Sequence, residues 1–396
     1  QLVLFLNNGI VPEIFEHGSV GASGDLVQLS HLALNLIGEG YVYENGVRKK
    51  ADEVLAAHGI EPLKLELRDG LGLINGTSCM TGIAAVNLIY AHRLLEWGIA
   101  ASSMLNEIIG AFDDSFSQEL NAVKHHKGQQ YIAGKMRDFV KGSALIRKRE
   151  ELFKDDTAMQ QVEFERKIQE YYSIRCVPQV IGPIYDTLVY AQNIVEDELN
   201  STNDNPVVKP DDNNVFHGGN FHGDYISLEM DKMKIVLTKL GMLMERQLNF
   251  LMNSKLNNKF PPFLNAGTWG LNFGLQGVQF TATSTTAESQ ALSTSVYIHS
   301  IPNNNDNQDI VSMGTNSAVL AKQVLENTYQ VTAIHMMAIC QAIDLLDPEE
   351  KAGLSSNAKT VYDKIRQHCN FITEDVTQFE SIAAVCNYMK ENPLGI

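Results

Sequence analysis

The chain has 396 residues and a formal net charge of −16, and 44% of its residues are hydrophobic and 20% charged. This composition excludes a disordered tail, and the acidic balance argues against nonspecific binding to nucleic acid or an anionic membrane, since both need clustered cations. We find no run of about 18 apolar residues that would predict a membrane span, and the first residues do not resemble a signal peptide. Five widely spaced cysteines without a CxxC pair predict reduced thiols and a cytoplasmic protein.

In chain order, the first long helical pattern follows Asp25, which we expect to cap it, and ends at Gly38. The stretch from Tyr41 to Arg48 predicts a β-hairpin with a type I′ turn at Asn45-Gly46. We expect further helices over about 80–112, 184–199, 225–253 and up to about 346, an exposed helix or flexible segment over 145–169, and irregular connections over 254–285. Long helices joined by polar loops favour a mainly α fold built as a long-helix bundle.

A run of small residues, Gly21-Ala22-Ser23-Gly24, immediately precedes the first long helix. Its simplest interpretation is a tight turn leading into a helix N-terminus. The alternative is a self-made electrophile, in which the nitrogen of Gly24 attacks the carbonyl carbon of Ala22 and closes a five-membered ring. Loss of one water there and one from Ser23 leaves an exocyclic methylidene, which accepts a nucleophile and forms a covalent intermediate.

Other polar residues have both a structural and a functional interpretation. Gln169, Tyr172 and Arg175 are spaced three apart and share one face if the segment is helical; Arg175 then either forms a surface ion pair or holds a carboxylate in a bidentate fork. Asn75 and Asn205 are typical of turns or caps, and Phe221 is typical of a core. His217 and His222 lack a nearby carboxylate pattern, so we expect no metal site.

Several blocks together resemble one enzyme family. The signature Gly-Ala-Ser-Gly-Asp-Leu at 21–26, followed by Leu29 and His-Leu-Ala at 31–33, resembles that of the MIO-dependent aromatic amino acid lyases. These are the histidine, phenylalanine and tyrosine ammonia-lyases and related aminomutases, and MIO is 4-methylidene-imidazole-5-one, the ring described above. Five further blocks match the family in the same order: 73–77, 169–176, 203–206, 219–223 and 307–309. Within the family, the sequence most resembles bacterial tyrosine ammonia-lyases.

The resemblance implies a helical bundle of the aromatic amino acid lyase type with a small MIO-bearing region and a short β-hairpin. Residues 1–65 would be the C-terminal part of the MIO-bearing N-terminal domain, and residues 66–396 a long helical bundle domain with C-terminal helices. It also implies an MIO formed from Ala22-Ser23-Gly24 without an external cofactor, and a homotetramer with shared active sites. The family's catalytic Tyr base and main ring-selectivity pair match no residue here, so we expect a further segment upstream.

Roles for individual residues follow from the same resemblance. Tyr172 would join the triplet in catalysis, supporting proton transfer or ring charge. Gln308 stands where histidine ammonia-lyases carry an acidic residue, which favours a phenyl or phenol side chain. Asn304 resembles tyrosine ammonia-lyases, where plant-type phenylalanine enzymes carry Glu, which favours a phenol. The residues expected to bind substrate are Asn75, Gln169, Arg175, Asn205, Phe221, Asn304, Asn307 and Gln308.

The implied reaction is non-oxidative deamination of an aromatic L-amino acid, tyrosine being favoured and phenylalanine also suitable, to 4-coumarate or cinnamate plus ammonia. Within the family, the alternatives are an MIO-dependent 2,3-aminomutase and a histidine ammonia-lyase. Outside it, the alternative is an inactive helical scaffold or binding protein, which would lack the cyclised ring.

Overall fold

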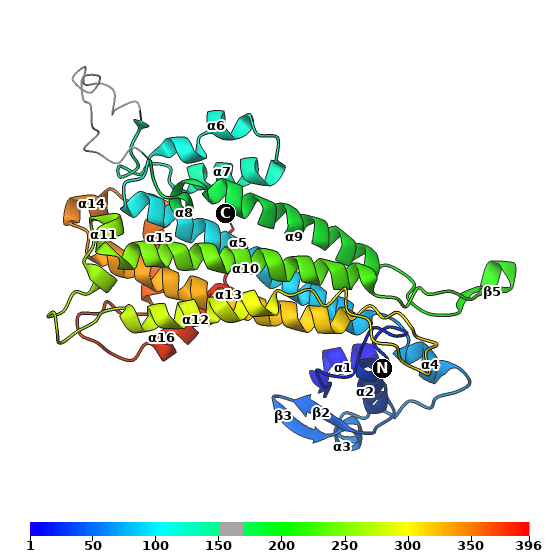
Figure 1. The fold of residues 1–396 in the computed structure, drawn as a ribbon. Coiled ribbons are helices and arrows are strands. Elements are labelled where there is room, and N and C mark those ends of the chain that lie inside the picture. The colour runs from blue at the N-terminus through cyan, green and yellow to red at the C-terminus, as the bar shows by residue number, and fades with distance from the viewer. Residues whose placement is uncertain (150–168, 396) are drawn as a thin grey trace. The chain divides into compact units, whose positions relative to one another are not determined.

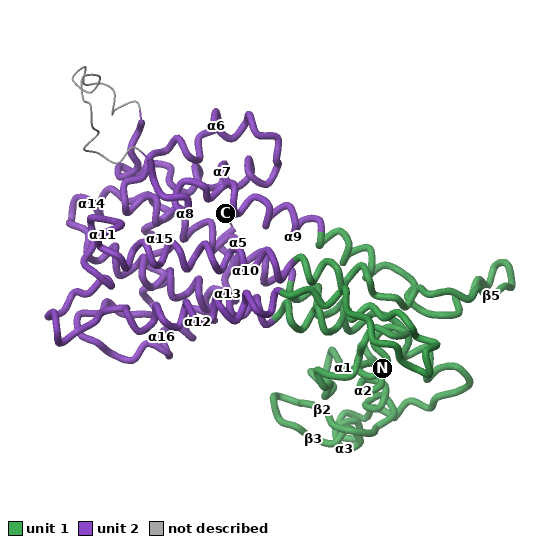
Figure 2. Tube along the Cα trace, in the orientation of Figure 1, with its two compact units in different colours: residues 1–87, 191–232, 294–322 green, residues 88–190, 233–293, 323–396 purple. Residues whose placement is uncertain are grey.

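A computed structural model describes residues 1–149 and 169–395 and divides the chain into two compact units (Figure 2). Unit 1 comprises residues 1–87, 191–232 and 294–322, and unit 2 comprises residues 88–190, 233–293 and 323–396. The expected mainly α architecture is confirmed. A domain boundary between residues 65 and 66 stays a prediction.

Unit 1 contains short helices, a three-stranded antiparallel sheet of order β1-β2-β3, and a separate two-stranded hairpin (Figure 1). Its elements are α1 (Leu2–Asn7), β1 (Ile10–Pro12), α2 (Leu26–Leu36), β2 (Tyr41–Glu44), β3 (Val47–Lys50), α3 (Ala51–Ala57), α4 (Asp69–Ile74), β4 (Val207–Lys209), a 3-10 turn (Pro210–Asp212) and β5 (Asn214–Phe216).

The expected hairpin at 41–48 is confirmed as β2 and β3. Asn45 and Gly46 have φ of 50° and 77°, the positive values that a type I′ turn requires at both central positions. Val42 faces a small core and pairs in register with Lys49 on β3. That core consists of Phe5, Ile10, Leu36, Val42, Ala51, Val54, Leu55 and Ile60.

Four long helices have residues in both units: α5 (Ser78–Ile108), α9 (Val177–Leu199), α10 (Asp224–Met252) and α13 (Gly314–Asp344). The remaining elements belong to unit 2: a 3-10 turn (Asp113–Phe116), α6 (Gln118–Ala122), α7 (Lys127–Phe139), α8 (Tyr172–Arg175), α11 (Ser254–Asn257), a second 3-10 turn (Pro262–Leu264), α12 (Gln276–Leu292), α14 (Pro348–Ala352), α15 (Ser356–Arg366) and α16 (Phe379–Glu391).

Helices α10, α12 and α13 run side by side in unit 2 (Figure 1). The helix expected over 225–253 is confirmed as α10, and its Leu237, Leu240 and Met244 are fully buried. Burying each such side chain stabilises the fold by about 1.5–3 kcal/mol. Buried hydroxyls add hydrogen bonds between helices, as where Thr328 Oγ1 donates to the carbonyl of Leu237 at 3.2 Å.

Two expected boundaries are wrong. The helix expected from Ile184 already begins at Val177, with Pro183 inside α9. Its ring lies on the exposed face while Ile181, Ile184 and Leu188 are buried, so packing of the apolar face outweighs the lost backbone hydrogen bond.

The irregular region expected over 254–285 is also partly wrong, because α12 begins at Gln276. This helix is rich in Ser and Thr, which usually favour turns. Here Thr286 donates its hydroxyl to the carbonyl of Ala282, and Ser289 donates to that of Thr285, so these side chains continue the helix rather than interrupt it. The charged segment expected over 145–169 falls largely on residues 150–168, outside the described residues.

None of the described helices combines the length and apolar character that crossing a bilayer would require.

His335 on α13 makes the stability of unit 2 sensitive to acid. The imidazole is completely buried, and neither ring nitrogen has a hydrogen-bond partner among the described residues. Burial lowers its pKa from 6.5 to about 3, so folding favours the neutral ring. Its contribution to stability is complete above pH 6.5 and is lost as the pH falls below that value, by about 1.4 kcal/mol per pH unit.

Between pH 6.5 and pH 5, we expect the unfolding free energy of His335→Leu to decrease by about 2 kcal/mol less than that of the wild type, measured by urea denaturation. His17→Leu, at an exposed position, is the matched control and should leave the slope unchanged. An unchanged slope in His335→Leu would show that other groups carry the acid sensitivity.

Candidate active site

The Ala22-Ser23-Gly24 segment forms a tight turn in unit 1. Gly21, Ser23 and Gly24 have φ of 76°, 54° and 73°, and a backbone bridge joins Gly21 to Gly24. Ala22 and Gly24 are buried, whereas Ser23 is half-buried. Positive φ is rare for a residue with a side chain, so Ser23 is held in a strained conformation by its surroundings.

Gly76, which follows α4, holds this turn from one side. Its N–H donates to the carbonyl of Ser23 at 3.3 Å, and its own carbonyl accepts from the N–H of Asp25 at 2.8 Å. A Cβ placed on Gly24 would overlap the carbonyl oxygen of Gly76. The close approach of these two backbone segments therefore requires glycine at position 24.

Asp25 does not cap α2 as expected, because its side chain points elsewhere. The completely buried carboxylate accepts hydrogen bonds from Ser19 Oγ at 2.8 Å, from the backbone N–H of Met80 at 2.8 Å and from Thr315 Oγ1. Burial raises its pKa, and these hydrogen bonds oppose that effect. Asp25 thus ties the end of the turn to the starts of α5 and α13.

Cys79, in the first turn of α5, is kept as a thiol. Burial, with the nearby charge of Asp25, raises its pKa to about 12. Because the thiolate is the reactive form of cysteine, Cys79 is a poor nucleophile at neutral pH.

Gln308 contacts the turn although it lies 285 positions after Ser23 in the sequence. Backbone hydrogen bonds of 3.0 and 3.2 Å pair Gln308 with Asn303 and close a tight loop. From its base, Gln308 Nε2 donates to Ser23 Oγ at 3.3 Å. Asn304 and Asn307 lie in the same loop with exposed side chains, and the N–H of Asn307 donates to the carbonyl of Asn304 at 3.2 Å.

A polar network surrounds Asn75, at the end of α4. Asn75 Nδ2 donates to Asp204 Oδ1 at 2.7 Å, and Arg68 Nη2 lies 3.1 Å from Asp204 Oδ2. The adjacent Asn205 is held by Arg68 Nη2, which donates to its carbonyl at 2.6 Å, and its side-chain oxygen accepts from the N–H of Gly218 at 2.8 Å. Two of the expected substrate-binding residues therefore share one network.

Phe221 is half-buried in unit 1, and the glycine two residues on packs close to Met80 and Ser312. A Cβ on Gly223 would overlap the sulfur of Met80. A contact between Phe221 and the turn stays a prediction.

The remaining expected residues form a second group in unit 2. Gln169 precedes the short helix α8, so the expectation that it shares a helical face with Tyr172 is wrong. The group nevertheless forms, because Arg175 Nη1 donates to Gln169 Oε1 and its guanidinium lies 5.0 Å from the ring centre of the exposed Tyr172. Gln169 and Arg175 also line a cavity of about 300 Å³.

The described residues fit an MIO ring at the turn. The ring needs a small residue, a serine and a glycine in a bent backbone, and the turn supplies them with the two outer residues buried. Gly24 lies so close to the backbone of Gly76 that no side chain would fit at position 24. When formed, the group supplies a strong electrophile for an amine.

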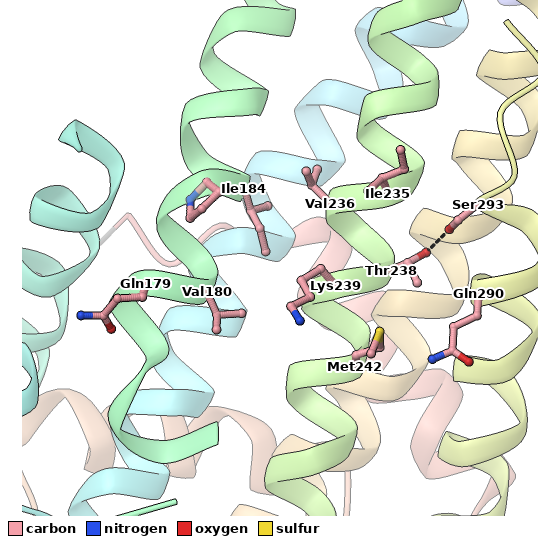
Figure 3. Close-up of a pocket in the computed structure, with 11 residues that line it drawn as sticks. Gln179, Val180, Ile184, Ile235, Val236, Thr238, Lys239, Met242, Gln290 and Ser293 are labelled. Carbon is pink, nitrogen blue, oxygen red and sulfur yellow. Dashed lines mark hydrogen bonds between the residues drawn. The ribbon is translucent and has the colours of Figure 1, made fainter. Parts of the chain in front are cut away.

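Another cavity of unit 2, of about 490 Å³, lies between α9, α10 and α12 (Figure 3). It is mostly apolar, with Ile184, Ile235 and Met242 among its walls and Lys239 beside them. A hydrogen bond joins Thr238 to Ser293 at one side. None of the residues expected at the site lines this cavity, so we assign it no role in the chemistry.

Among residues 1–149 and 169–395, no group of three or more His, Cys, Asp or Glu side chains is arranged to hold a metal ion.

Sequence reasoning missed the residues that support the site. Asp204 was visible only as part of the Asn-Asp-Asn-Pro turn cluster, and Arg68 lies 136 positions away from it along the chain. Asp204 could have been predicted as a site residue only from its position next to Asn205, an expected substrate-binding residue. Ser312 and Thr315, which contact Gly21 and Asp25, gave none.

Comparison with known proteins places the chain in a family. The sequence profile of the family described as aromatic amino acid lyase matches residues 1–367. A tyrosine 2,3-aminomutase of Myxococcus sp. (strain Mx-B0) is 40% identical over 369 residues, which cover 92% of this chain and 70% of the relative. A tyrosine ammonia-lyase of Cupriavidus metallidurans is 38% identical over 403 aligned positions, covering 100% of this chain and 74% of the relative.

Among solved structures, the tyrosine aminomutase of Streptomyces globisporus superimposes with a TM-score of 0.93 at 39% identity, covering 98% of this chain and 74% of the other. The chain is thus similar to a lyase and to aminomutases at comparable identity, and it spans 70–74% of the length of these three proteins. The resemblance found in the sequence blocks is confirmed: the chain belongs to the aromatic amino acid lyase family.

Proposed function

We propose that this chain forms an MIO and removes ammonia from an aromatic L-amino acid, with L-tyrosine favoured and 4-coumarate as the product. The observation that carries the proposal is the strained Ala22-Ser23-Gly24 turn, held by Gly76 and contacted at Ser23 by Gln308. Stored strain of this kind is typical of functional sites.

The chain's own residues bind and orient the substrate in this proposal. Arg175 holds the carboxylate in a fork, with Asn205 as a second contact. Asn75 accepts a hydrogen bond from the amine, and Phe221 packs against the aromatic ring. Gln169 lies beside Arg175, and Tyr172 supports transfer of the β-proton.

The loop that carries Gln308, with Asn304 and Asn307, would contribute to recognition of the aromatic side chain, as the family resemblance implies. A neutral amide can donate to or accept from a phenol hydroxyl, whereas an imidazole is better matched by a carboxylate. Gln308 therefore favours tyrosine or phenylalanine over histidine.

We infer, from the family resemblance noted in the sequence, a homotetramer whose active sites are completed by more than one copy.

A 2,3-aminomutase is the second candidate, favoured by the identity of the chain to tyrosine 2,3-aminomutases. Both reactions break the bond between the α-carbon and nitrogen and remove a β-proton; the aminomutase then returns the ammonia to the β-carbon.

Product analysis decides between these activities. The full-length protein is incubated separately with L-tyrosine, L-phenylalanine and L-histidine, and products are identified by chromatography and mass spectrometry. The proposal expects 4-coumarate and ammonia from tyrosine. Accumulation of β-tyrosine would favour the aminomutase, and no conversion of any substrate by ring-bearing protein would contradict the proposal.

Arg175→Ala tests carboxylate binding. Removing a charge-assisted hydrogen bond of about 1.5–3 kcal/mol should lower kcat/KM for the amino acid by about 10- to 150-fold, mainly through a higher KM. Arg175→Lys keeps the charge but not the bidentate geometry, so its kcat/KM should lie between those of the wild type and Arg175→Ala.

Arg246→Ala is the matched control, because Arg246 is an exposed residue of the same unit that pairs with Glu245. Steady-state kinetics unchanged in Arg175→Ala would return Arg175 to a surface role.

A further inference from the structure

We propose that Asp204, held by Arg68, is a positioning residue that fixes the amide of Asn75 with its oxygen directed toward the substrate amine. The inference rests on the proposed function and deepens it, since it concerns how the site recognises the leaving amino group. It is carried by the hydrogen bonds around Asp204, all within unit 1.

The orientation of Asn75 follows from what each group can donate. An ionised carboxylate only accepts hydrogen bonds, and Asp204 Oδ1 accepts from Asn75 Nδ2 at 2.7 Å. The amide NH₂ is therefore directed to Asp204, and Oδ1 of Asn75 points away from Asp204 at the opposite edge of the planar amide. An ammonium group only donates, so this arrangement offers it the atom it needs.

Asp204 stays ionised because of its neighbours. Although partial burial raises its pKa, hydrogen bonds from Asn75 and the N–H of Asn205, with the charge of Arg68, lower the pKa below its usual value. Protonation would turn one oxygen into a donor and would let the amide of Asn75 reverse.

Arg68 fixes Asp204 itself. Its Nη2 lies 3.2 and 3.1 Å from the two carboxylate oxygens and also donates to the carbonyl of Asn205 at 2.6 Å. One guanidinium thus holds both the carboxylate and the backbone of a second substrate-binding residue.

The backbone beside Asn75 is fixed independently. Gly76 forms backbone hydrogen bonds with Ser23 and Asp25. The hydroxyl of Thr77 donates to Glu198 and accepts from Asn203 Nδ2 at 2.7 Å. With the main chain held, the remaining freedom of Asn75 is in its side chain. Asp204 removes that freedom.

Asp204→Asn in the full-length protein is the direct test. The new amide can still accept from the N–H of Asn205 but can also donate to Asn75 Oδ1, so it permits the reversed orientation. We expect kcat/KM for the amino acid, per ring-bearing subunit, to fall about 10- to 100-fold, the effect of losing one hydrogen bond to a charged group.

An amine-free ligand separates positioning from general damage. The dissociation constant of 3-(4-hydroxyphenyl)propanoate, which keeps the ring and carboxylate but lacks the amine, should change by less than about threefold, because this ligand has no group that would bind Oδ1 of Asn75 and the new amide still accepts from the N–H of Asn205. An equal loss for this ligand, or unchanged amino acid kinetics, would overturn the proposal.

Variants of Arg68 test the same positioning proposal independently. Arg68→Met should lower kcat/KM, and Arg68→Lys should recover most of it by keeping the charge. Arg48→Met is the matched control, since Arg48 forms a similarly exposed ion pair with Glu13. Intact mass counts ring-bearing subunits in each variant.

Loss of the ring in both Asp204→Asn and Arg68→Met would assign the pair to ring formation instead and overturn positioning. Failure of the proposed function looks different, because the wild-type protein itself would then lack the ring or convert no amino acid.

Discussion

Ser23→Ala should abolish turnover, lowering the rate of 4-coumarate release by on the order of a thousandfold or more. Only the serine at the centre of the turn can lose water to give the exocyclic alkene. Its Oγ is half-buried and contacted by Gln308, so alanine fits the space while removing the chemistry. The measurements are ultraviolet detection of product and intact mass.

Mass and activity should change together. The wild-type chain should be lighter by two waters than its encoded sequence, whereas Ser23→Ala cannot lose the water that comes from the serine hydroxyl. Ser30→Ala is the matched control, because Ser30 lies in α2 and its hydroxyl donates to the carbonyl of Leu26, one turn earlier in the same helix. Normal turnover by Ser23→Ala would end the electrophile hypothesis.

Gly24→Ala should have the second large effect. A methyl group at this position overlaps the carbonyl oxygen of Gly76, and φ of 73° is unfavourable for any residue with a Cβ. The strain alone costs about 1–3 kcal/mol, and relieving it separates the turn from Gly76. We expect no mass loss, no detectable turnover and a free energy of unfolding lower by about 1–3 kcal/mol.

Gly72→Ala provides the comparison. Gly72 lies within α4, with open space where a Cβ would be added, so alanine there should be neutral or slightly stabilising. Equal behaviour of the two variants in mass spectrometry and denaturant titration would show that the approach of Gly24 to Gly76 does not matter.

The sequence was most informative where structure is decided locally. The Asn45-Gly46 turn was predictable because two positive φ values in succession favour those residues over others. The extent of α10 was predictable because its apolar residues repeat at helical spacing. Helix α12 was missed because its helical state depends on burial of small residues and on hydroxyls bonded back to the helix, which periodicity does not record.

The candidate site was predictable only in part for a related reason. The small-residue triplet implied its own chemistry, and the family resemblance brought Gln308 to it. Besides local donors, the carboxylate of Asp25 accepts from residues 55 and 290 positions away in the sequence. The carboxylate of Asp204 accepts from residues 129 and 136 positions away. Such partners are set by tertiary structure, so the sequence alone suggested a helix cap for Asp25.

The hydrogen bonds from Met313 and Thr315 to Val20 and Asp25 have a consequence for when the proposed ring could form. They connect the first tenth of the chain with a segment translated almost 300 residues later. A nascent polypeptide on the ribosome has not yet made these contacts while its early part emerges. The bent triplet would therefore reach its final geometry only after most of this sequence has been synthesised, so the proposed ring formation would follow the folding of both segments.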